Sequence, residues 1–242
     1  MSSRTRPWVR AALGLVGVMM SLPLLAGAPI VYSPGVARGQ TEFEYRSGHA
    51  HVNGQGTEHN YAFAVGHAFT SWWRPEVYVG RFERDSAGTT HFAGMELENI
   101  FQLTATGQYW ADAGFLLAYE FNPASLESDK VEFGPLFEKQ SGRVTQRLNL
   151  TWEKGVGPGS NAKYDFLGAY SFRYAVRKSF APGFEAFIAP TDNDYRIGPV
   201  VYGEKLFGMR GSELGYSAGL LLPLTADSPD STLVIRLEYE FY

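Results

Sequence analysis

The sequence contains no cysteine. Disulfide bonds are therefore excluded, and so is an N-terminal cysteine modified with lipid. An exported chain of this kind must be stabilised by interactions other than disulfide bonds. The sequence also has no cluster of Lys and Arg residues of the kind that phosphate contacts require. A nucleic-acid partner is not expected.

Long apolar runs are also missing after residue 40, so the rest of the chain has no candidate for a membrane-spanning helix. Before that point, three arginines precede an apolar run over 11–28 that is broken by Pro23. This is the layout of a secretory signal peptide, and an uncleaved membrane anchor is the alternative. We expect a helical signal peptide over 1–37, with a cleavage point between 28 and 39 that the sequence does not define.

Residues 38–242 then form one domain, and it is acidic. No Asp or Glu precedes Glu42, so removing residues 1–37 takes away three arginines only. The formal charge falls from -4 to -7, because 18 Lys and Arg remain against 25 Asp and Glu. Such a charge fits poorly with binding to phosphate-rich partners.

Aromatic residues are abundant, with 14 Tyr and 17 Phe, although the mean hydropathy is slightly negative. A chain that is aromatic but not apolar on average suits a structure with one apolar and one polar face. This composition is typical of a β-barrel in a membrane. Aromatic packing inside a soluble β-sandwich is the alternative.

The clearest pattern has a period of two. In 164–174, Tyr, Phe or Gly stands at every second position, and Asp165 and Arg173 lie on the opposite face. Side chains alternate across a β-strand, whereas a helix would scatter these aromatics around its circumference. The same alternation occurs in 60–66, 95–103, 109–121, 213–222 and 233–241.

Turn signals rich in Gly, Pro, Asn and Asp separate these runs. They lie at Asn53–Gly56, Arg74–Pro75, Asp85–Gly88, Thr106–Gly107, Asn122–Pro123, Ser141–Gly142, Gly155–Asn161, Ala181–Pro182, Thr191–Asp194, Gly208–Ser212 and Asp227–Asp230. Eleven connections predict about twelve strands, within a range of 10–14. We therefore predict an all-β fold, a closed, antiparallel, up-and-down transmembrane β-barrel that places both termini on one side.

Several segments resemble a family of proteobacterial outer-membrane proteins, the MetA-type transporter family of phenol meta-cleavage pathways. They are Glu96–Asn99, Gly114–Glu120, Gly198–Val201, Leu220–Thr225, Ser228–Asp230 and Leu237–Phe241. The resemblance implies a barrel in the bacterial outer membrane, in contact with lipid and lipopolysaccharide, that passes small solutes, hydrophobic or aromatic ones among them. The terminal strand also resembles the signal read by the barrel-assembly machinery, although its apolar register ends at Phe241, one residue before the last.

Charged residues on the polar faces of the strands are predicted to point inward, because a charge facing lipid is costly. The predicted lumen-lining residues are Glu96, Glu98, Asp112, Glu120, Glu132, Glu138, Asp165, Arg173, Glu185, Arg236, Glu238 and Glu240. Acids dominate, so a channel lined by them would favour cations. A structural or adhesive barrel whose lumen is filled by salt bridges is the alternative, and a width of twelve strands favours an open lumen.

Histidines and nucleophiles yield no assigned site. His49 and His51 share a strand face and, with His59 or His67, have the residue types for a Zn or Cu site, but exposed turn histidines explain them equally well. Ser47 near His49 lacks an orienting carboxylate. We therefore assign no catalytic residue, metal or cofactor, and a lipid-modifying barrel enzyme remains the third alternative. The sequence defines neither the solute nor the oligomeric state.

Overall fold

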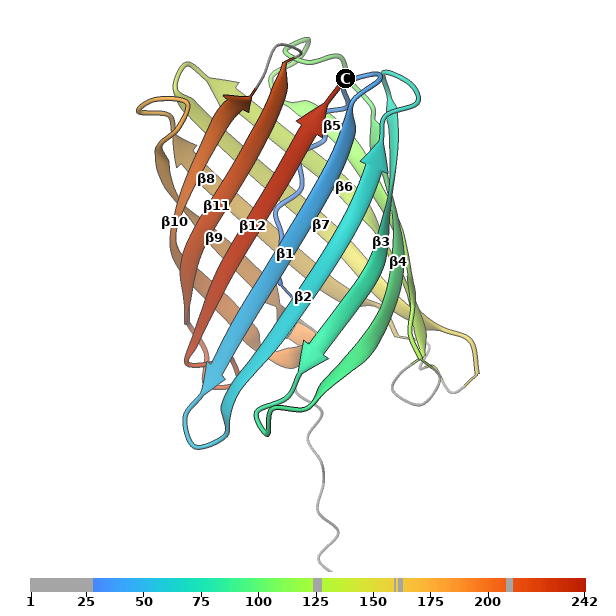
Figure 1. Ribbon diagram of the computed structural model, residues 1–242, viewed down its shortest axis with the longest axis vertical. Helices are drawn as coiled ribbons and strands as arrows, with labels where there is room; N and C mark the ends of the chain where they lie inside the picture. Colours follow the sequence, from blue (N-terminus) through green and yellow to red (C-terminus); the bar gives the residue numbers. More distant parts are fainter. Residues whose placement is uncertain (1–27, 124–127, 159, 161–162, 208–210) are drawn as a thin grey trace, which may run out of the picture.

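The computed structural model describes residues 28–123, 128–158, 160, 163–207 and 211–242, which form a single sheet of strands (Figure 1). The strands are β1 (Thr41–Val52), β2 (Gly56–His67), β3 (Trp73–Arg84), β4 (Thr90–Gln102), β5 (Asp112–Phe121), β6 (Asp129–Ser141), β7 (Val144–Val156), β8 (Asp165–Tyr174), β9 (Ala181–Ala189), β10 (Asp194–Phe207), β11 (Ser212–Pro223) and β12 (Ser231–Phe241). A short 3-10 helix, η2 (Pro190–Asp192), joins β9 to β10. The predicted signal helix over residues 1–27 lies outside the described residues.

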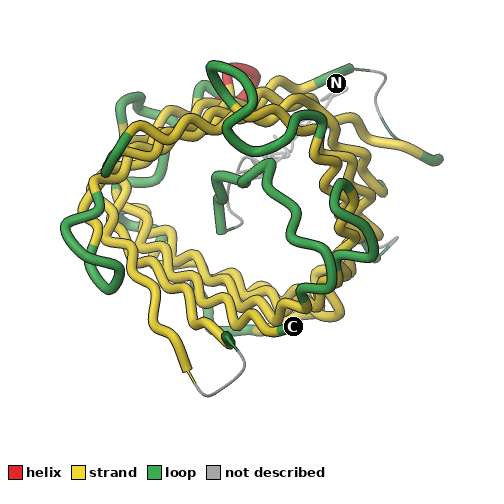
Figure 2. Tube along the Cα trace, turned by 90° about the horizontal axis from the view of Figure 1, so that it is seen from above, coloured by secondary structure: helices red, strands yellow, loops and turns green. Residues whose placement is uncertain are grey.

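The sheet closes into a barrel. Each strand pairs antiparallel with its neighbours in the chain, and β1 pairs with β12 (Figures 1 and 2). Closure satisfies the backbone groups that an open sheet edge would leave unpaired. The predicted closed antiparallel barrel of twelve strands is thus confirmed. Within the described part of the chain, none of the helices is both long and apolar enough to cross a membrane.

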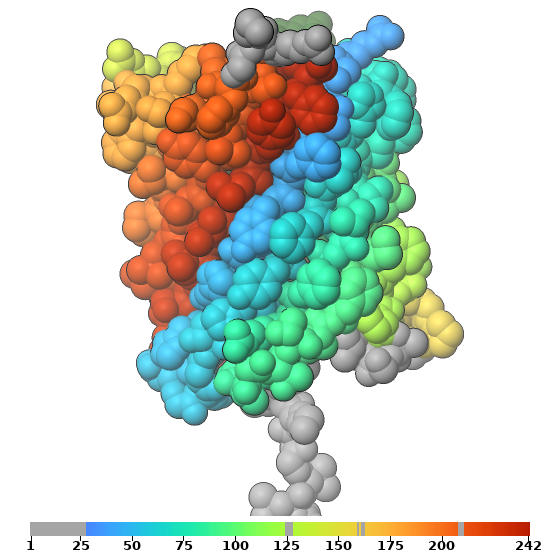
Figure 3. All heavy atoms as spheres, in the orientation of Figure 1, coloured from blue at the N-terminus to red at the C-terminus, as the bar shows by residue number. Residues whose placement is uncertain are grey.

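The two faces of the barrel wall differ sharply in character. On β1, the outward Phe43 is 49% exposed, whereas its neighbours Glu42 and Glu44 are 2% and 5% exposed. The described strands repeat this alternation, so large apolar side chains cover the outside and charged side chains are buried inside. Figure 3 shows the outer surface continuing across β12, β1 and β2 without an opening. An apolar surface of this extent suits contact with lipid rather than water.

The pairing of β3 with β4 contains an irregularity that changes which residues face inward. The register shifts between Tyr78 and Arg81. The Tyr78 hydroxyl donates to Glu44, and the Arg81 guanidinium binds Glu120, so both side chains face the lumen although they are three residues apart. Opposite the shift, Gly94 has a φ of 135°, a conformation in which a Cβ would stand 2.2 Å from the carbonyl oxygen of Phe121.

The chain before β1 runs inside the barrel. Residues 28–40 form a loop that crosses the space enclosed by the strands (Figure 2). Residues up to 37 belong to the segment for which we expect cleavage, so part of that segment occupies the lumen here. The three arginines and most of the apolar run of the expected signal peptide lie outside the described residues.

Candidate functional site: the barrel lumen

One line of paired residues crosses ten strands and is almost entirely acidic. Starting on β11 and moving across β12 and β1 to β8, the paired positions are Glu213, Glu240, Glu42, Gly66, Glu76, Glu98, Ala118, Glu132, Glu153 and Asp165. Eight of these ten positions hold Glu or Asp. We call this line the acidic row.

The acidic row runs from one end of the barrel to the other. Glu213 lies near the start of β11, at the end of the barrel that carries the C-terminus, and Asp165 begins β8 at the opposite end (Figure 1). The strands are tilted, so a line drawn across them climbs along the barrel axis. The row is therefore a spiral of carboxylates along the inside of the wall.

Sheet stability does not explain this row. Side chains of directly opposite residues lie about 4.5–5.5 Å apart at Cβ, and like charges in such pairs destabilise a sheet. Glu42 stands opposite Glu240, and Glu132 stands opposite Glu153. An arrangement that costs stability at successive pairs indicates that the carboxylates serve another purpose.

Basic side chains beside the row compensate part of its charge. Arg46 binds both Glu44 and Glu98, and Arg74 contacts Glu42 at 2.5 Å. The Lys130 ammonium lies 3.6 Å from the carboxylate of Glu153. Arg46 and Arg74 thus form ion pairs with neighbouring carboxylates, and the lumen wall stays predominantly acidic.

The structure places seven of the predicted lumen residues in the acidic row or in the row beside it. Glu98, Glu132, Asp165 and Glu240 belong to the acidic row. The neighbouring row contains Glu238, Glu44, Ala64, Tyr78, Glu96, Glu120 and Lys130. In that row, Arg81 contacts Glu120 at 2.7 Å and Glu96 at 4.0 Å.

The other five predicted residues form separate contacts. Glu185 is 1% exposed and accepts two hydrogen bonds from Arg236, at 2.7 and 2.8 Å. Glu138 binds Arg147 at 2.6 Å, and Arg173 lies 3.6 Å from Glu204. Asp112 differs from the rest: its carboxylate accepts a hydrogen bond from the amide of Gly107 at 2.6 Å, so it fixes the loop at the barrel end.

Several luminal charges escaped the sequence prediction. They are Glu42, Glu44, Arg46, Arg74, Glu76, Arg81, Arg147 and Glu153. Glu42, Glu44 and Arg46 alternate with Phe43 and Tyr45, so the period-two test applied to 42–46 would have found them. No simple alternation could have found Arg81, because the irregular pairing of β3 changes the inward phase.

The N-terminal segment is anchored to the lumen wall by polar contacts. The Tyr32 hydroxyl donates to Glu98 at 2.6 Å, and the Tyr32 backbone exchanges two hydrogen bonds with the side chain of Asn149. Ser33 donates to Glu138 at 2.9 Å, and the amide of Val36 donates to Gln102 at 2.7 Å. These contacts hold the segment against β4, β6 and β7.

An apolar contact adds to these polar anchors. Val31 is buried against Phe187, Leu221 and Val234. Tyr32 and Val36 pack against a second cluster formed by Ile100, Leu116 and Leu136. The segment therefore narrows the lumen and leaves cavities beside it, one of them with a volume of about 300 Å³.

The four histidines of the first hairpin, His49, His51, His59 and His67, lie away from the lumen. His49 Nδ1 and His59 Nδ1 are 2.7 Å apart, on the outward face of the first hairpin, and His51 contacts Thr57. His67 binds the hydroxyl of Thr41. In the described part of the chain, the group of three potential metal ligands is formed instead by Glu42, Glu44 and Glu238.

Comparison with known proteins supports the fold. No protein-family model matches the sequence, and no curated protein matches it. Among solved structures, the chain resembles an outer-membrane channel from Pseudomonas putida F1, with a TM-score of 0.59 and 16% identity over 85% of this chain and 96% of that one. The likeness shows that this chain shares the fold of that channel.

Two further likenesses are weaker. A bacterial polysaccharide outer-membrane secretin matches with a TM-score of 0.40 and 8% identity over 85% of this chain and 99% of that one. A triple mutant of the Rhodopseudomonas blastica porin matches with a TM-score of 0.30 and 7% identity, covering 83% of this chain and 98% of the porin.

Proposed function

We propose that this protein is a passive channel of the bacterial outer membrane that admits small solutes and favours cations. The observation that carries the proposal is the acidic row, which runs along the lumen between the two barrel ends. Rings or lines of carboxylates concentrate cations in a pore and exclude anions. Cation selectivity would then explain why the barrel keeps like charges opposite one another, although such pairs lower the stability of the sheet.

The location follows from the outer surface of the barrel. Aromatic and aliphatic side chains face outward along the strands, as a barrel in lipid requires. Lipid and lipopolysaccharide would contact this surface, and the barrel-assembly machinery would insert the chain after export and removal of its signal peptide. The likeness to an outer-membrane channel supports the same location. Recovery of the protein with outer membranes after cell fractionation is expected.

A hydrophobic or aromatic solute is the second candidate cargo. The resemblance to MetA-type transporters suggests it, and one structural observation favours it. Apolar side chains inside the lumen, among them Phe187, Leu221 and Ile100, pack against the N-terminal segment. Movement of that segment would expose these side chains to a passing solute. Liposome swelling with an aromatic solute and with a sugar of similar size compares the two classes.

Ion selectivity tests the main proposal. Refolded protein in a planar bilayer with a tenfold KCl gradient should give a reversal potential of the sign expected for cations, below the limit of about 59 mV for perfect selectivity. Neutralising two acids of the row, Glu76→Gln with Glu98→Gln, should move the potential toward zero. Asp227→Asn removes an exposed charge from the β11–β12 loop and serves as the matched control.

The alternative is a structural barrel with a filled lumen, which the anchoring of the N-terminal segment favours. A bilayer that stays sealed, with protein shown to be folded and inserted, would favour this alternative over the channel. We propose no enzymatic role, because the polar groups brought together in the lumen are charge pairs rather than a nucleophile with a base.

A further inference from the structure

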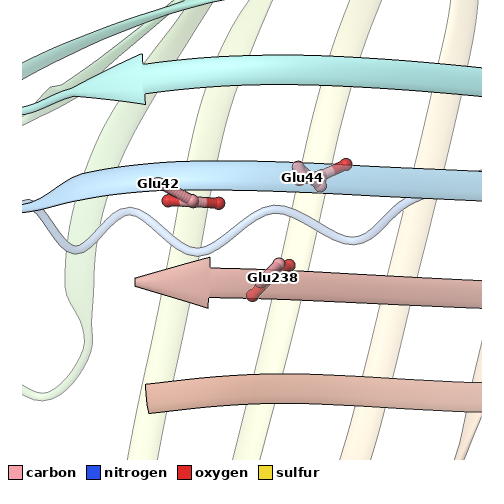
Figure 4. Close-up of side chains that lie close together, drawn as sticks. All are labelled: Glu42, Glu44 and Glu238. Atoms are coloured by element: carbon pink, nitrogen blue, oxygen red, sulfur yellow. The ribbon is translucent and has the colours of Figure 1, made fainter. Parts of the chain in front are cut away.

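A group of carboxylates lies at the seam where the first strand meets the last. Figure 4 shows Glu42 and Glu44 on β1 and Glu238 on β12. One oxygen from each of these residues lies within 4.8 Å of the others. Glu44 and Glu238 are directly paired across the seam, so the group spans the line that closes the barrel.

A fourth carboxylate is buried beside this group and is not fully satisfied. Glu76 on β3 is 3% exposed, and its Oε1 atom has no hydrogen-bond partner among the described residues. Its side chain lines the same cavity of about 300 Å³ as the other three. A buried, unpartnered carboxylate oxygen is costly, and its presence indicates that a ligand completes its contacts.

The charges around this cavity do not balance. Five carboxylates line it, those of Glu42, Glu44, Glu76, Glu238 and Glu240, against three guanidinium groups, those of Arg46, Arg74 and Arg147. With all groups ionised, the excess is two negative charges. Arg46 and Arg147 also bind Glu98 and Glu138. The cavity therefore has a deficit of positive charge that one divalent cation would fill.

From these observations we infer that the carboxylates of Glu42, Glu44, Glu76 and Glu238 form a divalent-cation site that links β1, β3 and β12 inside the lumen. Carboxylate oxygens are the ligands of hard cations. Calcium binds oxygen at about 2.3–2.6 Å, so oxygens on opposite sides of the ion are up to about 5 Å apart, which suits the present spacing. Magnesium would draw the ligands to about 4.2 Å and demands a stricter geometry.

The site goes beyond the proposed channel and does not require an open pore. A cation held here crosslinks the first strand to the last, so the closed barrel should resist unfolding better when calcium is present. The Tyr78 hydroxyl, 3.1 Å from an oxygen of Glu44, also places an aromatic donor next to the site. A bound terbium ion in the place of calcium should therefore give luminescence when tyrosine is excited.

Binding is measured on the refolded full-length chain in detergent, free of lipopolysaccharide, which itself binds calcium. Terbium luminescence and its displacement by CaCl₂ should give one ion per barrel. The temperature at which the barrel loses its folded electrophoretic mobility should rise by about 5–10 °C at a calcium concentration 100 times the dissociation constant, relative to excess EDTA.

Two isosteric variants test the ligands. Glu238→Gln and Glu76→Gln should each weaken calcium binding at least tenfold. Glu153→Gln removes a buried acid that lines a different cavity of the lumen, and it should leave calcium binding within twofold. Electrophoretic mobility before heating shows that each variant is folded. Absence of calcium binding to the folded wild-type protein at millimolar concentration would overturn the inference, and so would equal weakening by all three substitutions, which would indicate general screening of luminal charge.

Discussion

Removing the guanidinium of Arg236 tests whether water in the lumen reaches a buried ion pair. Arg236 is 5% exposed, and it binds both oxygens of Glu185, which is itself 1% exposed. Arg236 Nη2, which donates to Glu185, also donates to the carbonyl of Pro29 in the N-terminal segment. We expect Arg236→Met to leave Glu185 as a buried, uncompensated charge.

The magnitude follows from that burial. Breaking a buried pair by removing one partner costs about 3–5 kcal/mol, most of it the penalty of the charge left behind. Adding Glu185→Gln removes this charge while keeping an acceptor for the Tyr202 hydroxyl, which donates to Glu185 at 2.9 Å. We expect the double variant to regain about half of the lost stability or more.

Urea titration in detergent micelles, followed by tryptophan fluorescence and by electrophoretic mobility, gives the free energy of unfolding for each variant. The matched comparison is Glu185→Gln alone, which completes the double-mutant cycle. A loss below about 1 kcal/mol for Arg236→Met would refute the reasoning, because it would mean that water in the lumen screens the charge. A double variant as unstable as Arg236→Met would refute it as well.

Three further predictions concern the lumen and the wall. Deleting 29–36 from the refolded full-length chain should raise its single-channel conductance in planar bilayers, because this segment narrows the lumen (Figure 2), and unchanged conductance would show that ions pass elsewhere. Gly94→Ala should lower the free energy of unfolding, measured by urea titration, by more than about 2 kcal/mol, because the added methyl group would clash with the carbonyl oxygen of Phe121. The control is Gly142→Ala, where φ is also positive but the space is open, and it should cost about 1–2 kcal/mol. Raising KCl from 0.1 to 1 M at a fixed gradient should lower the cation preference, since the Debye length falls from about 10 to about 3 Å, and a constant preference would contradict an electrostatic origin.

The sequence by itself determined the type of fold. Strict alternation, as in 164–174, leaves only a strand with one apolar and one polar face, because helical geometry would mix the two sets. Turn signals then predicted the number of strands, which the structure confirms as twelve. Two of the signals, Arg74–Pro75 and Ala181–Pro182, lie at the beginning of β3 and β9 rather than between strands. Because every second residue of a strand lies on the same face, the alternation also assigns the charged residues to one face. Residues such as Glu98 and Glu132 could therefore be predicted to face the lumen without a structure.

Which charges lie next to one another was decided only by the tertiary structure. The acidic row depends on the register between strands, and register is set by turns and packing that alternation within one strand does not encode. The site at the seam joins residues 42 and 238, which closure of the barrel makes neighbours. The inward position of Arg81 depends on the irregular pairing of β3, and the place of 28–40 inside the lumen depends on contacts with many strands at once. Local pattern therefore fixes the faces of a barrel, and only its closed three-dimensional pairing fixes the arrangement of charges within it.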